Sequence, residues 1–411
     1  MRYIQSTDFC IHLLILWWVL WLTVSCSELN EYIRPSFCVR LQYIMFIFLF
    51  IVGYLTVRFS YRCFRSRAVE SSLNFKTHLF RMRFIIYFVC LLSFIVLIFS
   101  LYSSGAFSTD FTKYLIKLRT ETMNDKVLTG YKYVDILTKF LIFPSTYTLI
   151  LLVLSVGIKK FKMVFFLSIL NFLLYSYLWQ VNYPMIHLFW FIFFFMLLQF
   201  VQKSSFDWRI FILLSSIATV LILSSINRFG GDWLGAVQTY IVDYHLVGFS
   251  FYDYQYNNSG SILHIHSYGR SSLGFIDQVV DLISRRIDVD YKAASFENST
   301  YNDIAVDIGF RNVREINAFG TFLFSFYRDF NFIGIAVGGY LYGAFITYTL
   351  LNYKKSWICR VLFFLLSTTW MMGMMVSPVE QGYFWFSILF LGLLKVISRG
   401  VSFGSSQLNR G

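Results

Sequence analysis

The sequence predicts an all-α polytopic membrane protein, with about ten transmembrane helices and one large external loop that contains amphipathic helices. Hydrophobic residues form 57% of the 411 residues and charged residues only 14%, and the mean hydropathy is +0.61. A soluble globular chain is roughly half apolar and a quarter charged. In addition, the apolar residues fall into long runs. These features exclude disordered, collagen-like, coiled-coil and disulfide-scaffold proteins.

The predicted spans are apolar runs close to the roughly 20 residues that a bilayer requires. The first run is too long for the core of a signal peptide and has only Arg2 as a basic flank, so we interpret it as a span. The seventh is bounded by Arg209 and Arg228. The ten segments are 10–26, 41–57, 82–101, 134–156, 162–179, 185–201, 209–227, 331–351, 357–377 and 382–398.

The net charge of +13 is a signal of membrane orientation. Most Lys and Arg residues of the short loops fall on one side of the predicted spans, as Lys159 and Lys160 do. Basic loops stay in the cytoplasm, so we expect a multi-pass protein with both termini cytoplasmic and segments 102–133 and 228–330 outside. Because the positive charge is explained in this way, we expect no nucleic-acid partner.

The external segment 228–330 is long enough to be functional or to form a small domain. Within it, residues 274–289 have apolar side chains at helical spacing and predict an amphipathic helix. Segment 102–133 predicts a second amphipathic helix, lying in the membrane interface. We therefore divide the chain into transmembrane helices 1–7 in residues 1–227, the loop 228–330, and transmembrane helices 8–10 with a cytoplasmic C-terminus in residues 331–411.

The strongest local signal lies in residues 311–330. On a helix with 100° per residue, Arg311, Arg314 and Arg328 share one face and aromatic residues occupy the other. Arginine recognises phosphate and pyrophosphate through paired hydrogen bonds, so this face predicts a clamp for an anionic lipid head group. The alternative is an interfacial helix whose arginines contact ordinary anionic lipids. The same polar face carries Asn317, Thr321, Ser325 and Asp329.

Other external residues have two or more interpretations. Arg228 is either a snorkelling side chain or a second phosphate contact. His264 and His266 fit a solvated turn, a general base or the start of a metal site, but a third metal ligand is not evident and we expect no metal. Glu380 either lies in a short exposed turn or lines the same external cavity as the arginines.

The sequence leaves two interpretations open for each of two further residue pairs. Asp135 and Lys139 lie four residues apart in the fourth predicted span, as a functional pair or as a snorkelling ion pair. Pro144 follows and is expected to kink this helix. Cys26 and Cys38 flank the first external loop and are either bonded or two free thiols.

The segment that begins at Asn317 resembles the signature of bacterial oligosaccharide repeat-unit polymerases, the Wzy-type O-antigen polymerases. In that family an Asn-x-aromatic-x-Thr stretch precedes Tyr-x-Asp-Phe-Gly and a glycine-rich span. Here Asn331 replaces the Gly expected after Phe330. The resemblance covers the overall layout and, closely, only this stretch. The matching residues are Asn317, Ala318, Phe319, Gly320, Thr321, Tyr327, Arg328, Asp329, Phe330 and Gly334.

The resemblance implies a fold like that of the C-type glycosyltransferases and a role in lipopolysaccharide biosynthesis. Such enzymes act at the periplasmic face of the bacterial inner membrane on oligosaccharides linked to undecaprenyl pyrophosphate. They transfer the growing glycan from its carrier to the next lipid-linked repeat unit, without metal or nucleotide, so no cofactor is expected. The implied partners are these lipid-linked oligosaccharides, the lipid bilayer, a chain-length regulator and a flippase.

The resemblance also implies roles for individual residues. A pyrophosphate leaving group gains negative charge as the glycosidic bond breaks, and arginines placed there stabilise the transition state. This assigns Arg228, Arg311 and Arg314 to the pyrophosphate, with Arg328 as a further candidate. Asn317, Thr321 and Tyr327 join them as substrate-binding candidates.

The base for the acceptor hydroxyl is not resolved by the sequence, and the candidates are Asp329, His266 and Glu380. Trp233, Tyr254 and Tyr256 are either sugar-stacking platforms or the core of the loop.

Two other functions compete with the polymerase. An O-antigen ligase transfers glycan to lipid A core and carries a His-containing motif in its large loop, a place where this chain has His264 and His266. A flippase or transporter of lipid-linked oligosaccharides is expected to have charges in the middle of several spans and little external domain. This chain shows the reverse pattern, and its two halves lack paired broken helices.

Overall fold

The computed structural model is mostly helical over the residues it describes. Its only strands there are β1 (Val306–Asp307) and β2 (Glu315–Ile316), which pair antiparallel. The all-α prediction is therefore confirmed for this part of the chain. The described residues are 2–64, 83–106, 129–179, 181, 183–201, 208, 211–213, 215–217, 219, 234–235, 238–302, 304–310, 313, 315–316 and 320–407.

Seven helices among the described residues are long and apolar enough to cross a membrane, and they correspond to the first six predicted spans and the eighth. The ninth and tenth predicted spans appear as shorter apolar helices, Trp357–Met372 and Gly382–Ile397. Most of the predicted seventh span, 209–227, lies outside the described residues. The seven are Asp8–Ser25, Phe37–Tyr61, Arg83–Ser104, Lys132–Val156, Lys162–Trp179, Tyr183–Phe200 and Phe322–Leu351.

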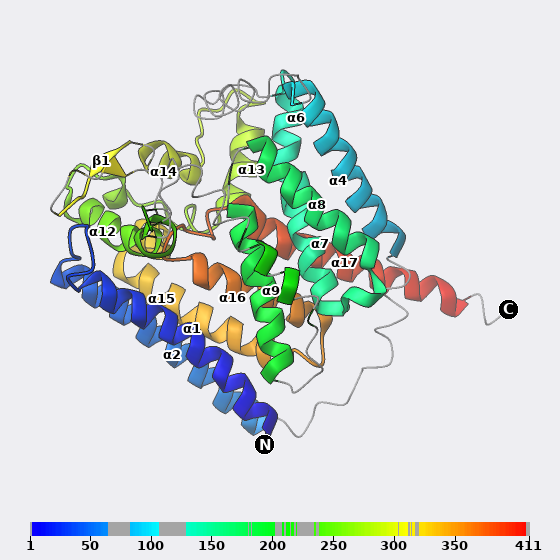
Figure 1. The fold of residues 1–411 in the computed structure, drawn as a ribbon, viewed down its shortest axis with the longest axis horizontal. Coiled ribbons are helices and arrows are strands. Elements are labelled where there is room, and N and C mark those ends of the chain that lie inside the picture. Colours follow the sequence, from blue (N-terminus) through cyan, green and yellow to red (C-terminus); the bar gives the residue numbers. More distant parts are fainter. Residues whose placement is uncertain are drawn as a thin grey trace. The chain divides into compact units, whose positions relative to one another are not determined.

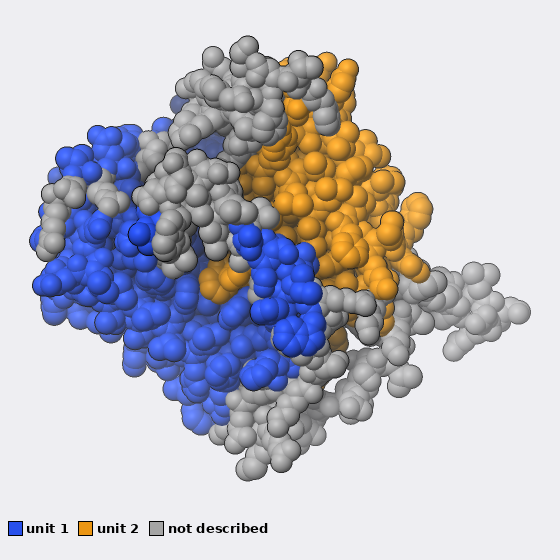
Figure 2. Space-filling view, viewed as in Figure 1, with its two compact units in different colours: residues 1–68, 193–353, 362–385 blue, residues 69–192, 354–361, 386–411 orange. Residues whose placement is uncertain are grey.

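The chain divides into two compact units, which are coloured separately in Figure 2. Unit 1 comprises residues 1–68, 193–353 and 362–385, and unit 2 comprises residues 69–192, 354–361 and 386–411.

Besides the β-strands, the elements are α1 (Arg2–Ser25), α2 (Phe37–Phe64), α4 (Arg83–Ser104), α6 (Lys132–Leu137), η3 (Thr138–Ile142), α7 (Phe143–Val156), η4 (Ile158–Lys160), α8 (Lys162–Trp179), α9 (Tyr183–Val201), η5 (Gln238–Asp243), α12 (Tyr244–Asn257), η6 (Ile262–His264), α13 (Gly274–Ser284), α14 (Ala294–Asn302), α15 (Phe322–Leu351), α16 (Trp357–Met372) and α17 (Gly382–Gln407).

Unit 1 is built on the long helices α1, α2 and α15, which run side by side (Figure 1). Helices α2 and α15 approach closely because glycines face the partner backbone. A Cβ atom at Gly343 would lie 2.0 Å from the carbonyl oxygen of Phe50, and one at Gly53 would lie 2.1 Å from that of Tyr340. Such small-residue contacts are the usual way for helices to pack within a membrane. The buried Trp18 indole donates to the Trp370 carbonyl oxygen at 3.0 Å.

Unit 2 packs α4 against α7 and α8. Pro144, where the sequence predicts a kink, follows a π-helical turn, Thr138–Ile142. Proline lacks the amide hydrogen that the helix needs, and its ring clashes with the preceding turn, so the chain widens there.

Asp135 and Lys139, the charged pair of the fourth predicted span, each have another contact. The carboxylate of Asp135 accepts from Thr129 Oγ1 at 2.7 Å. The Lys139 ammonium lies 4.2 Å from the centre of the Trp179 ring.

The helix predicted over residues 311–330 is corrected by the structure. Glu315 and Ile316 form β2, so the helix begins only after Thr321, and α15 continues through to Leu351. The helical spacing of the arginines is overridden because residues 315–316 pair with β1. Arg311, Arg314 and Asn317 lie outside the described residues.

Helix α15 bends at Phe330 and Asn331, where the backbone leaves helical geometry. Asn331 has a φ of 53°, in the left-handed region that favours glycine. This is the position at which the resembled signature has Gly. The bend places the buried first part of α15, including Arg328 and Asp329, next to the loop segments that follow α12.

The structure bears in a different way on each of three other sequence predictions. The amphipathic helix predicted over residues 274–289 is present as α13, but it ends at Ser284. Cys26 and Cys38 are free thiols. Most of the segment 102–133, where an interfacial helix was expected, lies outside the described residues.

Candidate functional site

Buried polar side chains gather at the first turns of α15, within unit 1. They come from α15, α14, the segment 265–272 and the turn 373–381 between α16 and α17. Of the residues predicted as functional, Arg328, Asp329 and Glu380 meet in this cluster. Thr321 lies apart from it, where its hydroxyl is 3.2 Å from the Tyr43 hydroxyl. Arg228, like the two predicted clamp arginines of 311–314, lies outside the described residues.

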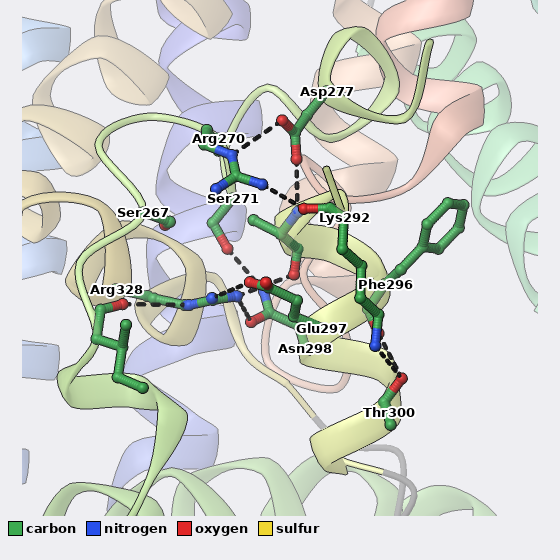
Figure 3. A network of polar contacts seen from close by, with 12 residues as sticks. Ser267, Arg270, Ser271, Asp277, Lys292, Phe296, Glu297, Asn298, Thr300 and Arg328 are labelled. Carbon is green, nitrogen blue, oxygen red and sulfur yellow. Dashed lines mark hydrogen bonds and ion pairs between the residues drawn. The ribbon is translucent and has the colours of Figure 1, made fainter. Parts of the chain in front are cut away.

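Arg328 is 2% exposed, and its guanidinium is engaged by protein groups. Nη2 donates to Glu297 Oε2 at 2.5 Å, and Nη1 donates to Asn298 Oδ1 and, at 2.9 Å, to the Ala294 carbonyl oxygen. Nε donates to the carbonyl oxygen of Ile265 at 3.3 Å. Figure 3 shows the side chain extended toward Glu297 and Asn298 on α14. Arg328 thus ties both α14 and the segment 265–272 to α15.

Asp329 holds the adjacent turn with both carboxylate oxygens. Oδ1 accepts from Ser267 Oγ at 2.5 Å and from the Ser271 amide at 3.0 Å. Oδ2 accepts from the Ser272 amide at 2.8 Å. Because its two oxygens accept from three donors in this turn, Asp329 fixes the conformation of residues 267–272.

Glu380 lies in the turn before α17 and is 8% exposed, so it is not in an exposed turn. Its Oε1 accepts from Asn298 Nδ2 at 2.7 Å, from Ser271 Oγ at 3.4 Å and from Ser325 Oγ. No donor reaches Oε2 among the residues that the structure describes. One oxygen is therefore fixed, and the other is left for an exchangeable proton.

The environment of Glu380 raises the pKa of its carboxyl group from 4.5 to about 7. Burial is the largest cause, since it disfavours the charged form, and the nearby Asp329 acts in the same direction. The hydrogen bonds from Ser325 and Asn298 and the charge of Arg328 oppose the shift. The group is therefore close to half-protonated at neutral pH, as suits proton transfer.

Asn298 connects the two charged groups of the cluster. Its Oδ1 accepts from Arg328 and its Nδ2 donates to Glu380, so both partners are satisfied by one amide orientation. The same Nδ2 also lies 2.6 Å from Ser271 Oγ (Figure 3). Asn298 is fully buried. Ser325 was placed on the polar face of residues 311–330 by its spacing, whereas Ser271 and Asn298 follow no periodic pattern and were not found from the sequence.

A second carboxylate fixes the start of α14. Asp277 on α13 accepts from Arg270 Nε at 3.1 Å, from the Tyr291 hydroxyl and from the Ala294 amide at 2.5 Å. Because α14 carries the Asn298 side chain, this contact also helps to position the donor to Glu380.

The two histidines lie on the surface near the bend of α15. His266 Nε2 is 3.3 Å from Asn331 Nδ2, and His264 Nε2 is 3.1 Å from the Tyr256 carbonyl oxygen. The Tyr256 ring contacts the Tyr327 ring at 5.5 Å between centres. Among the described residues, no three His, Cys, Asp or Glu side chains are grouped to hold a metal ion.

Gly274 brings α13 against the turn that carries Glu380. A Cβ atom at Gly274 would lie 2.2 Å from the Glu380 carbonyl oxygen. We therefore expect Gly274→Ala to lower the free energy of unfolding by about 1–3 kcal/mol, because the backbone of the turn must move. Denaturant unfolding in detergent micelles measures this change.

Gly260→Ala is the matched control. Its added Cβ would lie 3.5 Å from Asn258 Oδ1, an ordinary contact, and we expect a change within about 0.5 kcal/mol. If the two alanine variants unfold at the same denaturant concentration, the close contact between Gly274 and Glu380 is contradicted.

Comparison with protein-family models, with curated proteins and with solved structures finds no match to this chain.

Proposed function

We propose that this protein is a polymerase of lipid-linked oligosaccharide repeat units, an enzyme of the glycosyltransferase class. One observation carries the proposal: the signature residues Arg328 and Asp329 meet the buried Glu380, whose carboxyl group has one fixed and one available oxygen. The apolar helices are suited to an enzyme whose substrates are lipids. The proposal includes the finer topology, with ten spans, cytoplasmic termini and a periplasmic loop at the bacterial inner membrane.

In the proposed reaction, Glu380 accepts the proton of the acceptor hydroxyl on the incoming repeat unit. That oxygen forms the new glycosidic bond to the growing chain while the bond to the carrier breaks, and undecaprenyl pyrophosphate leaves. Arg228, Arg311 and Arg314 remain candidates to stabilise the leaving group. The contacts of Arg328 and Asp329 favour a positioning role, because these residues hold α14 and residues 267–272 around Glu380.

Deletion of the gene in its native host tests the proposal. We expect lipopolysaccharide that carries core plus a single repeat unit, seen on a silver-stained gel, and a restored ladder when the wild-type gene is supplied. Bare core with polymer accumulating on the lipid carrier would identify a ligase instead. Bare core without periplasmic polymer would identify an export protein, and an unchanged ladder would exclude the polymerase function for this glycan.

A further inference from the structure

Helix α13 buries its polar side chains and exposes its apolar ones, which is the reverse of a helix that faces water. Asp277, Asp281 and Ser284 are buried against the protein together with Gly274. A water-exposed helix presents its polar face outward and buries its apolar stripe. The outward side of α13 instead carries large aliphatic side chains, with Ile283 56% exposed. These side chains, the α13 outer face, are Ile276, Val279, Val280, Leu282 and Ile283.

The aspartates on the buried face of α13 have hydrogen-bond partners within unit 1, so the fold itself holds the helix in this orientation. Asp281 accepts from Arg285 Nη2 at 2.7 Å and Nε at 3.2 Å. Asp277 is held by Arg270, Tyr291 and the start of α14. Turning the helix to hide its aliphatic face would break the bonds of Asp277 to Tyr291 and Ala294, which lie outside α13, and would leave a buried carboxylate without these partners. The aliphatic face therefore stays outward.

The position of α13 indicates which medium meets this face. Its first residue, Gly274, packs on the backbone of Glu380, in the turn that joins two apolar helices, Trp357–Met372 and Gly382–Ile397. Helix α13 therefore begins where the chain leaves its apolar segments. At the other end of α13, Arg285 and Arg286 are exposed, and basic side chains at a membrane surface pair with lipid phosphates.

We propose that the α13 outer face is seated among the acyl chains of one bilayer leaflet, with Arg285 and Arg286 at the level of the lipid phosphates. Amphipathic helices of this kind bind at the boundary between head groups and acyl chains. The proposal does not depend on polymerase activity. It has a structural consequence, because Asp277 on the inner face of α13 holds the amide of Ala294 in α14, the helix that contacts Glu380. The lipid-seated helix and the buried carboxyl group are thus parts of one packed assembly.

The test places a fluorophore on the α13 outer face of the full-length protein. In a background with Cys26, Cys38 and Cys63 changed to serine, Ile276→Cys and Ile283→Cys are each labelled with an NBD fluorophore. Ser259→Cys, at an exposed turn after α12, is the matched aqueous control. Each labelled protein is reconstituted into vesicles of phosphatidylcholine and phosphatidylglycerol, with or without phosphatidylcholine that carries a doxyl group on its acyl chain. The background protein without an added cysteine gives the labelling of the buried Cys10, Cys90 and Cys359.

We expect the labels at positions 276 and 283 to lose fluorescence in the doxyl-lipid vesicles and to resist quenching by aqueous iodide. The label at position 259 is expected to behave in the opposite way. Iodide quenching at 276 and 283 without doxyl quenching would overturn the proposal, since the face would then meet water. Protection from both quenchers, or a disulfide between the 283 positions of two copies, would overturn it as well, because protein would then cover the face.

Discussion

Replacing Arg328 by alanine is expected to lower the free energy of unfolding by about 3–5 kcal/mol, because this arginine is 2% exposed and its loss leaves four acceptors without their donor. The substitution removes the donors to Glu297 and Asn298 and to the carbonyl oxygens of Ala294 and Ile265. Three of these acceptors lie on α14, and the fourth lies on the segment 265–272, which Asp329 also holds. Denaturant unfolding of the purified protein in detergent micelles measures the effect.

Arg34→Ala is the control for the loss of an exposed arginine. Arg34 lies 5.6 Å from the centre of the Phe310 ring, and exposed contacts of this kind contribute about 0.5–1 kcal/mol. We also expect Arg328→Lys to be destabilised, because an ammonium group lacks the planar fork that reaches partners on two segments. Wild-type stability in both Arg328 variants would contradict the role assigned to this residue.

Replacing Glu380 by glutamine is expected to reduce polymerisation about 10²–10⁴-fold, the range for loss of a general base. Glutamine keeps the size of the side chain and an oxygen that accepts from Asn298 and Ser325, so the fold is retained. The repeat-unit ladder in a deletion strain that carries the variant measures this loss. Full activity of Glu380→Gln, at normal expression, would exclude Glu380 as the base and leave Asp329 and His266.

Glu380→Gln also tests how much Glu380, rather than other titrating groups, contributes to the pH dependence of stability. Burial raises the pKa of Glu380 from 4.5 to about 7, so between these pH values the folded protein keeps a proton that the unfolded chain releases. The free energy of unfolding therefore falls as pH rises through this window, by about 3 kcal/mol in total. We expect this fall in the wild type and not in Glu380→Gln. An equal pH dependence in both proteins would contradict the raised pKa.

The sequence by itself was sufficient to predict the helical membrane architecture. Hydropathy adds up over consecutive residues, so runs such as 41–57 and 162–179 identify spanning helices without any tertiary information. The amphipathic helix α13 was also predicted from its spacing, although neither its end at Ser284 nor the outward direction of its apolar face was. Arg328 and Asp329 were candidates because they lie on the polar face of 311–330 and in the resembled signature, and Glu380 because it is the only acid of the last predicted external loop.

Only the tertiary structure decided how those candidates are used. Glu315 and Ile316 pair with residues 306–307, which ends the helical pattern of the arginines before α15. Glu380 meets Ser271 and Asn298 across long stretches of chain, and these two partners leave no periodic trace. The outward direction of the aliphatic face of α13 likewise depends on what binds its acids. Local sequence sets which elements form, whereas long-range hydrogen bonds set which face of each element is buried and which carboxyl group keeps a proton.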